Sequence, residues 1–524
     1  MKLKNKFLML IMFVLLFAVS ACSKGETAGS SEGSKEGTKG KSELKLTLSA
    51  QPPTLDTVAT NSVDSATVAR NIFETLVTPN SNFQPTPMLA KSVDISEDGK
   101  TYTFVLRQGV KFHNGKEMTS EDVVASMNRW KEASVVAKDV LGDAVFEAKD
   151  DYTVTLQLQQ PSSGLLNILA STKQFPAIMP KEIVEKATPE GVTEFIGTGP
   201  FKVEEVKQNQ YIHLTKNDDY QPVDGKADGL AGKREALVDD VYFYIVKDAA
   251  TRLSAIQTGE YDINTDVYFE QYDTVKKDKN IQTYPDQYGN LMAVYNKKSG
   301  LFTNQKMRQA INAAINTEDI MLATFSHEEL FNLDHGYMSK DQKDWYTKKG
   351  LESYNQADTK KAKELLKEAG YNGEEIKLIA TSDYSEHYDS AVVLEGQLRE
   401  LGVNVKLETF DWPTLLEKRK DPAAWDILVT GYSTVTTPAQ ILYLNPNDHG
   451  WTDDAKIADL LAKINAAPST AEAQPLWAEL QEYASNEYVP VTTFGTYSLV
   501  AAARSNVKGF EIFQGPVVWN TSVQ

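Results

Sequence analysis

A single cysteine, Cys22, constrains what this chain of 524 residues can fold into. One thiol can form neither an internal disulfide nor a cysteine-based zinc site. Hydrophobic cores must therefore hold the fold, and a chain that is 41% hydrophobic and 10% aromatic can build them in roughly two to four domains. The formal net charge of −18 argues against nucleic acid or an anionic membrane surface as the direct partner of the folded part, because such partners require a basic face.

The N-terminal segment is typical of a targeting sequence. Three lysines within residues 1–6 precede an apolar run over residues 7–19. The run is shorter than the ~20 residues of a membrane span and is typical of a signal peptide. It ends in Val19-Ser20-Ala21-Cys22, which resembles the lipobox of bacterial lipoproteins. The resemblance implies cleavage before Cys22 and a lipid on its thiol, and two acyl chains suffice for stable anchoring. The alternative is an ordinary signal peptide with a chance cysteine.

Residues 23–43 consist mainly of Gly, Ser, Lys and Glu without a hydrophobic pattern. This composition predicts a flexible tether. We therefore expect a signal peptide over residues 1–21, followed by the lipidated cysteine and tether over residues 22–43.

From Leu44 onward, strand and helix patterns alternate. Residues 93–106 predict a hairpin with its turn at Asp98-Gly99, and Val154, Leu156 and Leu158 predict a half-buried strand. Helices are expected after Thr119, over residues 307–315, and over residues 358–370, where an Asp cap and a Gly stop flank the apolar pattern. The fold class is mixed α/β in several domains.

Motifs for catalysis or metal binding are missing from the sequence. There is no P-loop, the six histidines form no H-E-x-x-H motif, and 72 acidic residues are too many to single out an acid/base pair. We predict no catalytic group, no metal site and no cofactor. A secreted hydrolase remains an alternative.

Aromatic residues gather late in the chain, at Trp412, Trp425, Tyr432, Tyr443 and Trp451. Most aromatic side chains belong to hydrophobic cores. The functional alternative is a concave apolar cleft with a few polar anchors, which is the usual form of a small-ligand site.

Several separate segments together resemble the extracellular solute-binding proteins of family 5, the oligopeptide, dipeptide and nickel binders of bacterial ABC importers. They include NIFETL at residues 71–76, the strand, Phe-His-x-Gly turn and helix start within residues 90–126, GTGPF at 197–201 with NDDY at 217–220, and FTNQKMRQAINAAINTEDI at 302–320. Residues 362–371 and 507–510 match as well.

The resemblance implies an α/β fold of the periplasmic-binding-protein type, a two-lobed clamp with an inserted smaller domain (class II-like, cluster C). Lobe I would comprise residues 44–84, 198–288 and 490–524, the inserted domain II residues 85–197, and lobe III residues 289–489. Two chain crossings would form the hinge, and ligand would be buried between the lobes.

The resemblance also implies the site residues. Asp411 to Leu416 matches a segment whose Trp lines the pocket, so Trp412 is a candidate, and Arg419 matches a ligand-contacting Arg. Tyr432 takes a position where the family commonly has Trp, and its ring would stack on or wall the ligand.

One departure concerns the loop Ser433-Thr434-Val435-Thr436-Thr437-Pro438. Peptide binders carry an Asp here that pairs with the peptide α-ammonium, and its position falls on Thr434 or Val435. The hydroxyls of Ser433, Thr434 and Thr436 suit a neutral polar ligand, and Asp56 is an alternative acid.

The implied function is the substrate-binding lipoprotein of an ABC importer, which captures a peptide and delivers it to the permease. We expect a monomer, lipid-anchored on the outer face of the cell membrane, with no nucleic-acid partner. The alternatives are a non-peptide solute such as an oligosaccharide, an opine or a metal chelate, and a signalling lipoprotein with the same cleft.

Overall fold

In the computed structural model, which describes residues 42–524, the chain enters the fold on β1 (Glu43–Leu48). The backbone N–H and the hydroxyl of Ser42 both donate to the Asp239 carboxylate, each over 2.9 Å. Glu43 then pairs with Asp240 of β10 (Asp240–Ile245), so the strand begins one residue inside the predicted tether. The predicted signal peptide, Cys22 and residues 23–41 lie outside the described residues.

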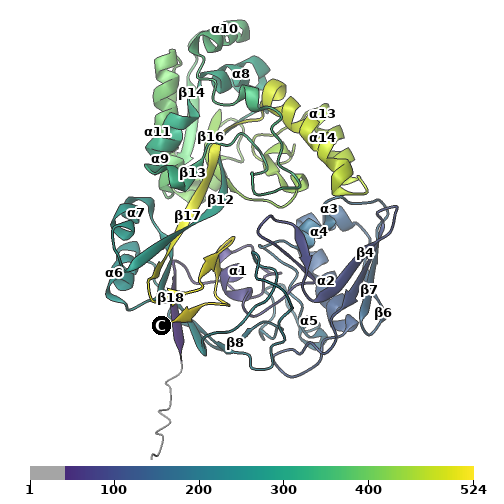
Figure 1. The fold of residues 1–524 in the computed structure, drawn as a ribbon. Helices are drawn as coiled ribbons and strands as arrows, with labels where there is room; N and C mark the ends of the chain where they lie inside the picture. The colour runs from purple at the N-terminus through teal and green to yellow at the C-terminus, as the bar shows by residue number, and fades with distance from the viewer. Residues whose placement is uncertain (1–41) are drawn as a thin grey trace, which may run out of the picture. The chain divides into compact units, whose positions relative to one another are not determined.

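One large mixed sheet runs through both lobes (Figure 1). Its strand order is β15-β14-β16-β12-β17-β11-β1-β10-β9-β8, with the short β13 (Phe331–Asn332) beside β17. The remaining bounds are β8 (Phe201–Lys207), β9 (Tyr211–Lys216), β11 (Ile263–Val267), β12 (Ile281–Tyr295), β14 (Ile376–Thr381), β15 (Val405–Phe410), β16 (Ile427–Ser433) and β17 (Val491–Arg504).

The long antiparallel strands β12 and β17 carry this sheet from one lobe to the other (Figure 1). Gln287 pairs with Ser498 and Gly289 pairs with Tyr497, so Tyr288 is an extra residue on β12. Such a bulge bends and twists a strand. The predicted boundary at 288/289 lies at this bulge. The predicted boundary at 489/490 precedes β17, whose residues 491–497 pair with the lobe III part of β12.

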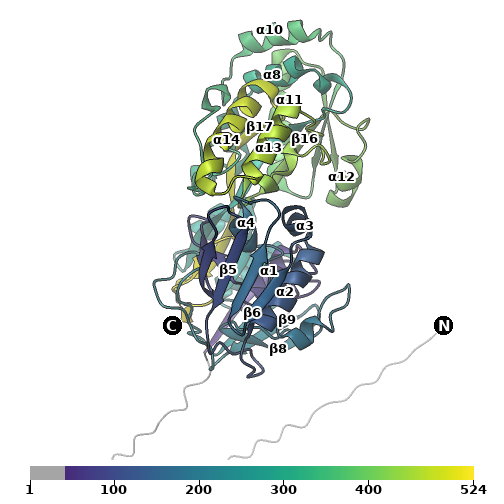
Figure 2. The same ribbon diagram turned by 90° about the vertical axis from the view of Figure 1, so that its right-hand side faces the viewer.

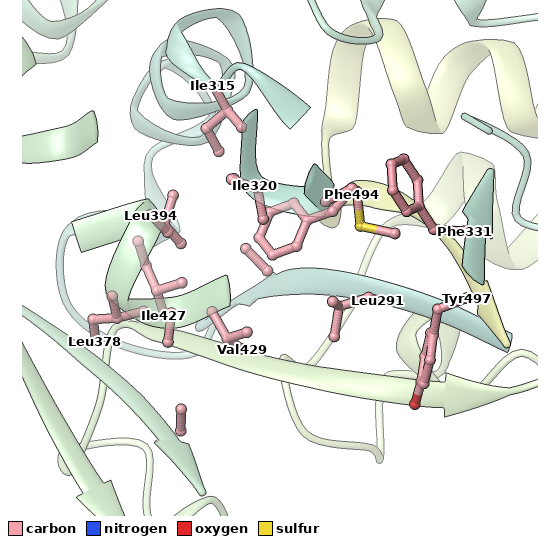
Figure 3. Close-up of a cluster of buried hydrophobic side chains, with 14 of the residues drawn as sticks. Leu291, Ile315, Ile320, Phe331, Leu378, Leu394, Ile427, Val429, Phe494 and Tyr497 are labelled. Carbon is pink, nitrogen blue, oxygen red and sulfur yellow. The ribbon is translucent and has the colours of Figure 1, made fainter. Parts of the chain in front are cut away.

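Lobe III has a hydrophobic core on one face of its strands (Figure 3). Leu291, Leu378, Ile427 and Val429 point to this face, where α8 (Gln305–Ala314), α9 (Thr317–Phe325) and α11 (Ser385–Leu401) cover them. Leu428 belongs to a second cluster because successive side chains of a strand alternate between faces.

The helix predictions of this region hold in the structure, with one difference. α10 (Thr359–Ala369) begins after the Asp358 cap and ends at Gly370, whose φ of 78° suits glycine. The pattern over residues 307–315 is correct for α8, but Ile315 lies after its last turn, because Asn316 caps α9.

The inserted segment forms its own antiparallel sheet, in the order β4-β5-β7-β6 (Figure 2). β4 (Ala90–Ile95) and β5 (Thr101–Leu106) make the predicted hairpin, and α2 (Ser120–Ala133) starts after Thr119 as expected. β7 (Thr153–Gln157) contains Val154 and Leu156, while Leu158 follows it, and β6 spans Phe146–Asp150.

Within residues 42–524, none of the helices combines the length and the apolar composition that a membrane crossing requires.

Candidate ligand-binding cleft

The parallel strands of both lobes point their carboxyl ends at one region. In lobe III, β14 runs parallel to β15 and β16, and these strands end at Thr381, Phe410 and Ser433. In lobe I, β1 and β11 are parallel and end at Leu48 and Val267. Ligands of open α/β sheets bind outside such strand ends. The residues that follow these strands are therefore the candidates.

A cleft of about 770 Å³ occupies this region and is lined from both lobes and from the inserted segment. Lobe I contributes residues of α1 (Val63–Ala69) and α7 (Phe269–Lys276), and lobe III contributes the segment 382–389 and Trp412. The crossing strands contribute Tyr288 and Tyr497, and the inserted segment contributes Lys173. The lining therefore combines aromatic rings with charged groups.

Trp412 lies in the wall of this cleft. Trp412 is the first residue of α12 (Trp412–Lys418), which Asp411 caps by accepting the Thr414 N–H. The backbone N–H of Trp412 donates to the Asp383 carboxylate over 2.8 Å. The ring centroid lies 5.2 Å from that of Tyr384. Arg419 follows α12, with its guanidinium carbon 6.0 Å from the Trp412 ring centroid, and does not belong to the lining that residues 42–524 provide.

His387 and Gly431 meet at the floor of the cleft. The Gly431 N–H donates to His387 Nε2 over 2.8 Å, so the ring proton lies on Nδ1. Burial lowers the pKa of His387 to about 4, and the ring is neutral at physiological pH. A Cβ on residue 431 would collide with the hydroxyl of Tyr497 and lie 2.9 Å from His387 Nε2, so only glycine fits.

Tyr432 points to the opposite face of β16 from Gly431. Its ring packs against Tyr443, with 5.2 Å between centroids, and burial raises the pKa of its hydroxyl. Tyr432, Ser433 and Thr434 line a separate cavity of about 70 Å³. The structure thus puts these three residues and Trp412 in different cavities.

Two hydroxyls of the 433–437 loop are used by the protein itself. Thr434 Oγ1 donates to the Tyr288 carbonyl over 3.1 Å, and Thr436 Oγ1 donates to the Asn167 carbonyl over 3.0 Å. The second bond joins lobe III to the inserted segment, as does the bond of 2.6 Å from Ser163 Oγ to the Ile464 carbonyl. The structure therefore has the inserted segment in contact with lobe III.

Asp56 is fully buried, away from the cleft lining. Its carboxylate forms an ion pair of 2.5 Å with Arg129 and accepts the Val192 N–H over 2.9 Å. Both of these contacts are made to Oδ2, while Arg129 Nη1 and the Val58 N–H donate to Oδ1, so both carboxylate oxygens have partners within the fold.

None of the acidic residues that line the cleft was predicted from the sequence. Within residues 42–524, seven carboxylates and one lysine, Lys173, line it. The acids are Asp64, Asp266, Glu270, Asp286, Asp383, Glu386 and Asp389. One signal was present, because the segment SDYSEHYD at 382–389 directly follows a buried parallel strand. The others come from separate parts of the chain and carry no local pattern.

Comparisons with known proteins agree with this architecture. The family model of bacterial extracellular solute-binding proteins, family 5, matches residues 84–453. A probable peptide ABC transporter periplasmic-binding protein of Sinorhizobium fredii is 30% identical over 489 residues, which cover 89% of this chain and 90% of that protein.

Solved structures agree as well. The ABC transporter substrate-binding protein CtaP of Listeria monocytogenes superposes with a TM-score of 0.78 at 25% identity, covering 90% of this chain and 95% of that one. The binding protein AgaA from A. tumefaciens R10, in complex with agropinic acid, superposes with a TM-score of 0.72 at 27% identity, covering 92% and 99%. The chain belongs to the bacterial extracellular solute-binding proteins of family 5.

Proposed function

We propose that this protein captures a short peptide in the 770 Å³ cleft and delivers it to the permease of an ABC importer. The observation that carries the proposal is a cleft lined from both lobes, at the point where β12 and β17 cross between them. Its volume falls within the roughly 300–1,000 Å³ of small-ligand sites, which favours a short peptide. Ligand held by both lobes favours the closed arrangement, which the permease would recognise.

Two features of the cleft support a peptide. Trp412, Tyr384 and Tyr288 offer rings against which side chains can pack. Lys173 lies 5.2 Å from the Tyr288 ring centroid, and acids of α1 and α11 lie elsewhere in the lining. The free carboxylate of a zwitterionic peptide could pair with Lys173, and its ammonium group could pair with these acids. The relative from Sinorhizobium fredii, named as a peptide transporter component, is consistent with this class of ligand.

Tyr432, Ser433 and Thr434 have a different role in this proposal. Their small cavity would accept at most a side-chain group of the ligand, while Trp412 contacts its main body. Thr436 and Arg419 would act by positioning the loop and the Trp412 ring.

Native mass spectrometry of the purified protein, followed by calorimetry with short peptides, tests the proposal. We expect a co-purified mass that matches a peptide, stoichiometric binding, and ligand recovered unchanged. Turnover of the ligand would instead indicate an enzyme. Binding of another solute together with no binding of any peptide would contradict the peptide proposal.

A non-peptide solute is the second candidate. The loop 433–437 carries no acid for a peptide α-ammonium, and the relative AgaA was solved with agropinic acid. Opines and oligosaccharides therefore belong in the same calorimetric panel, and exclusive binding of one of them would favour this candidate.

We also propose that Cys22 anchors the protein as a lipoprotein on the outer face of the membrane, and that the protein acts as a monomer. Cys22→Ser should move the protein from the membrane fraction to the medium or periplasm. Light scattering of the tether-free protein should give the mass of one chain.

A further inference from the structure

The charges that line the cleft are strongly unbalanced. Among the residues described, 42–524, the lining holds seven carboxylates against Lys173. Three of these acids have a cation close by: Asp266 pairs with Arg252 over 3.0 Å, the charge of Arg252 also acts on Asp64, and the charges of Arg70 and Lys173 act on Asp286. The lining keeps an excess of negative charge after these compensations.

Glu386 is the most confined of these acids. It is 8% exposed, it lines the cleft from the first turn of α11, and no lysine, arginine or histidine within residues 42–524 pairs with it. Burial raises the pKa of Glu386 to about 7, and the charges of Asp266, Glu270 and Asp389 add to the rise. A buried carboxylate without a cation is costly, so its position in a ligand cleft calls for a partner from the ligand.

Acids from the two lobes face each other across this cleft. Glu386 and Asp389 belong to α11 of lobe III, whereas Asp64, Asp266 and Glu270 belong to α1, β11 and α7 of lobe I. The charge of Asp266 acts on both Glu386 and Asp64. Bringing the lobes together therefore opposes like charges, and a positive group between them would convert that repulsion into attraction.

We propose that the cleft selects cargo with a cationic group, an ammonium or a guanidinium, which lies between Glu386 of lobe III and Asp266 of lobe I and drives closure. This inference rests on the proposed function and names its class of substrate. It also assigns the recognition of positive charge to α11 and β11, in place of the acid-free loop 433–437. Ligand affinity and lobe closure are coupled because the cation binds the closed arrangement better than the open one.

Calorimetry with matched peptides tests the proposal. Ala-Lys-Ala and Ala-norleucine-Ala differ by one ammonium, and N-acetylated forms of both remove the α-ammonium. The proteins are the wild type, Glu386→Gln, and the control Glu400→Gln, which makes the same change at an exposed position of α11. Gln has nearly the size and shape of Glu and removes the negative charge, replacing one carboxylate oxygen by an NH2 group.

If the side-chain ammonium is the cationic group, Ala-Lys-Ala binds the wild type about tenfold or more tightly than its norleucine match, even when acetylated. If the α-ammonium is the group, the two free peptides bind alike and acetylation weakens both by that factor. In either case Glu386→Gln removes most of the gain and Glu400→Gln keeps it. The inference would be overturned if neither ammonium group changed the affinity of the peptide, or if Glu386→Gln kept the gain in affinity that an ammonium group provides.

If no peptide binds, the peptide proposal itself fails, and spermidine serves as the cationic probe. Spermidine that binds the wild type and not Glu386→Gln would support the charge inference without peptides. Spermidine that binds neither protein would overturn it.

Discussion

The rings of Tyr288 and Tyr497 lie 5.4 Å apart between centroids, at the shift in register where β12 and β17 pass from one lobe to the other. Both side chains line the cleft. The crossing strands thus form part of the ligand site, so a change in their bend alters the cleft directly.

Gly431→Ala should destabilise the protein, because the new Cβ would collide with the Tyr497 hydroxyl. Overpacking of this kind costs about 1–3 kcal/mol in the free energy of unfolding. Denaturant unfolding measures the loss, and adding Tyr497→Phe should recover part of it by removing the oxygen. The control is Gly396→Ala in α11, where a Cβ meets nothing within 4 Å and should be neutral or stabilising. Equal stability of Gly431→Ala and wild type would contradict the collision.

Trp412→Ala should weaken ligand binding with little loss of stability, since the ring is half-buried in the cleft wall. Tyr432→Ala should show the reverse, with an affinity close to wild type and a stability loss of about 3 kcal/mol, because its ring packs on the other face of the sheet. Calorimetry and thermal unfolding of the two variants separate the roles. A larger affinity loss in Tyr432→Ala than in Trp412→Ala would reverse this assignment.

The stability of the ligand-free protein should fall with rising pH because of Glu386. Its pKa is about 7 in the fold against a usual value near 4.5. A raised carboxyl pKa disfavours the charged form, so the penalty is absent below pH 4.5, grows between pH 4.5 and 7, and is complete above 7. Asp266, Glu270 and Asp389 are the charged groups that act on it, and the hydroxyls of Tyr288, Tyr384 and Tyr497 stay neutral over this range.

Glu386→Gln should therefore unfold at a higher temperature than wild type at pH 8 and at nearly the same temperature at pH 4.5. The full difference corresponds to roughly 3 kcal/mol. Glu400→Gln should match wild type at both pH values, because Glu400 is exposed. A pH-independent difference between Glu386→Gln and wild type would indicate a packing effect instead of a charge effect.

Thr436→Val should loosen the contact between the inserted segment and lobe III, since it removes the donor to the Asn167 carbonyl and keeps the side-chain shape. We expect a shift toward the open arrangement and therefore weaker ligand binding. Among residues 42–524, Thr436 is not part of the lining of the 770 Å³ cleft, so a loss of affinity would not come from a lost ligand contact. Small-angle scattering with and without ligand measures the shift. Thr359→Val, at an exposed position of α10, is the matched control. Unchanged scattering and affinity would show that this bond does not contribute to closure.

Local features of the sequence were sufficient to predict many of the helices, strands and turns of the fold. The Asp98-Gly99 turn, the Thr119 and Asp358 caps and the apolar spacing of α8 depend on residues close together in the chain, so their patterns can be read directly. The family resemblance extended this to the two-lobed architecture. The same resemblance implied Trp412 as a pocket residue, and its side chain lies in the wall of the cleft.

The tertiary structure alone decided how the candidate residues divide between cavities. Gly431 and Tyr432 are neighbours in sequence, yet they face opposite sides of the sheet because side chains alternate along a strand. The acids around Glu386 come from three helices and a strand of two lobes, so no local pattern marks them outside the segment 382–389. Their charge becomes significant only where folding brings them together and removes water, since burial and mutual repulsion depend on distance in space.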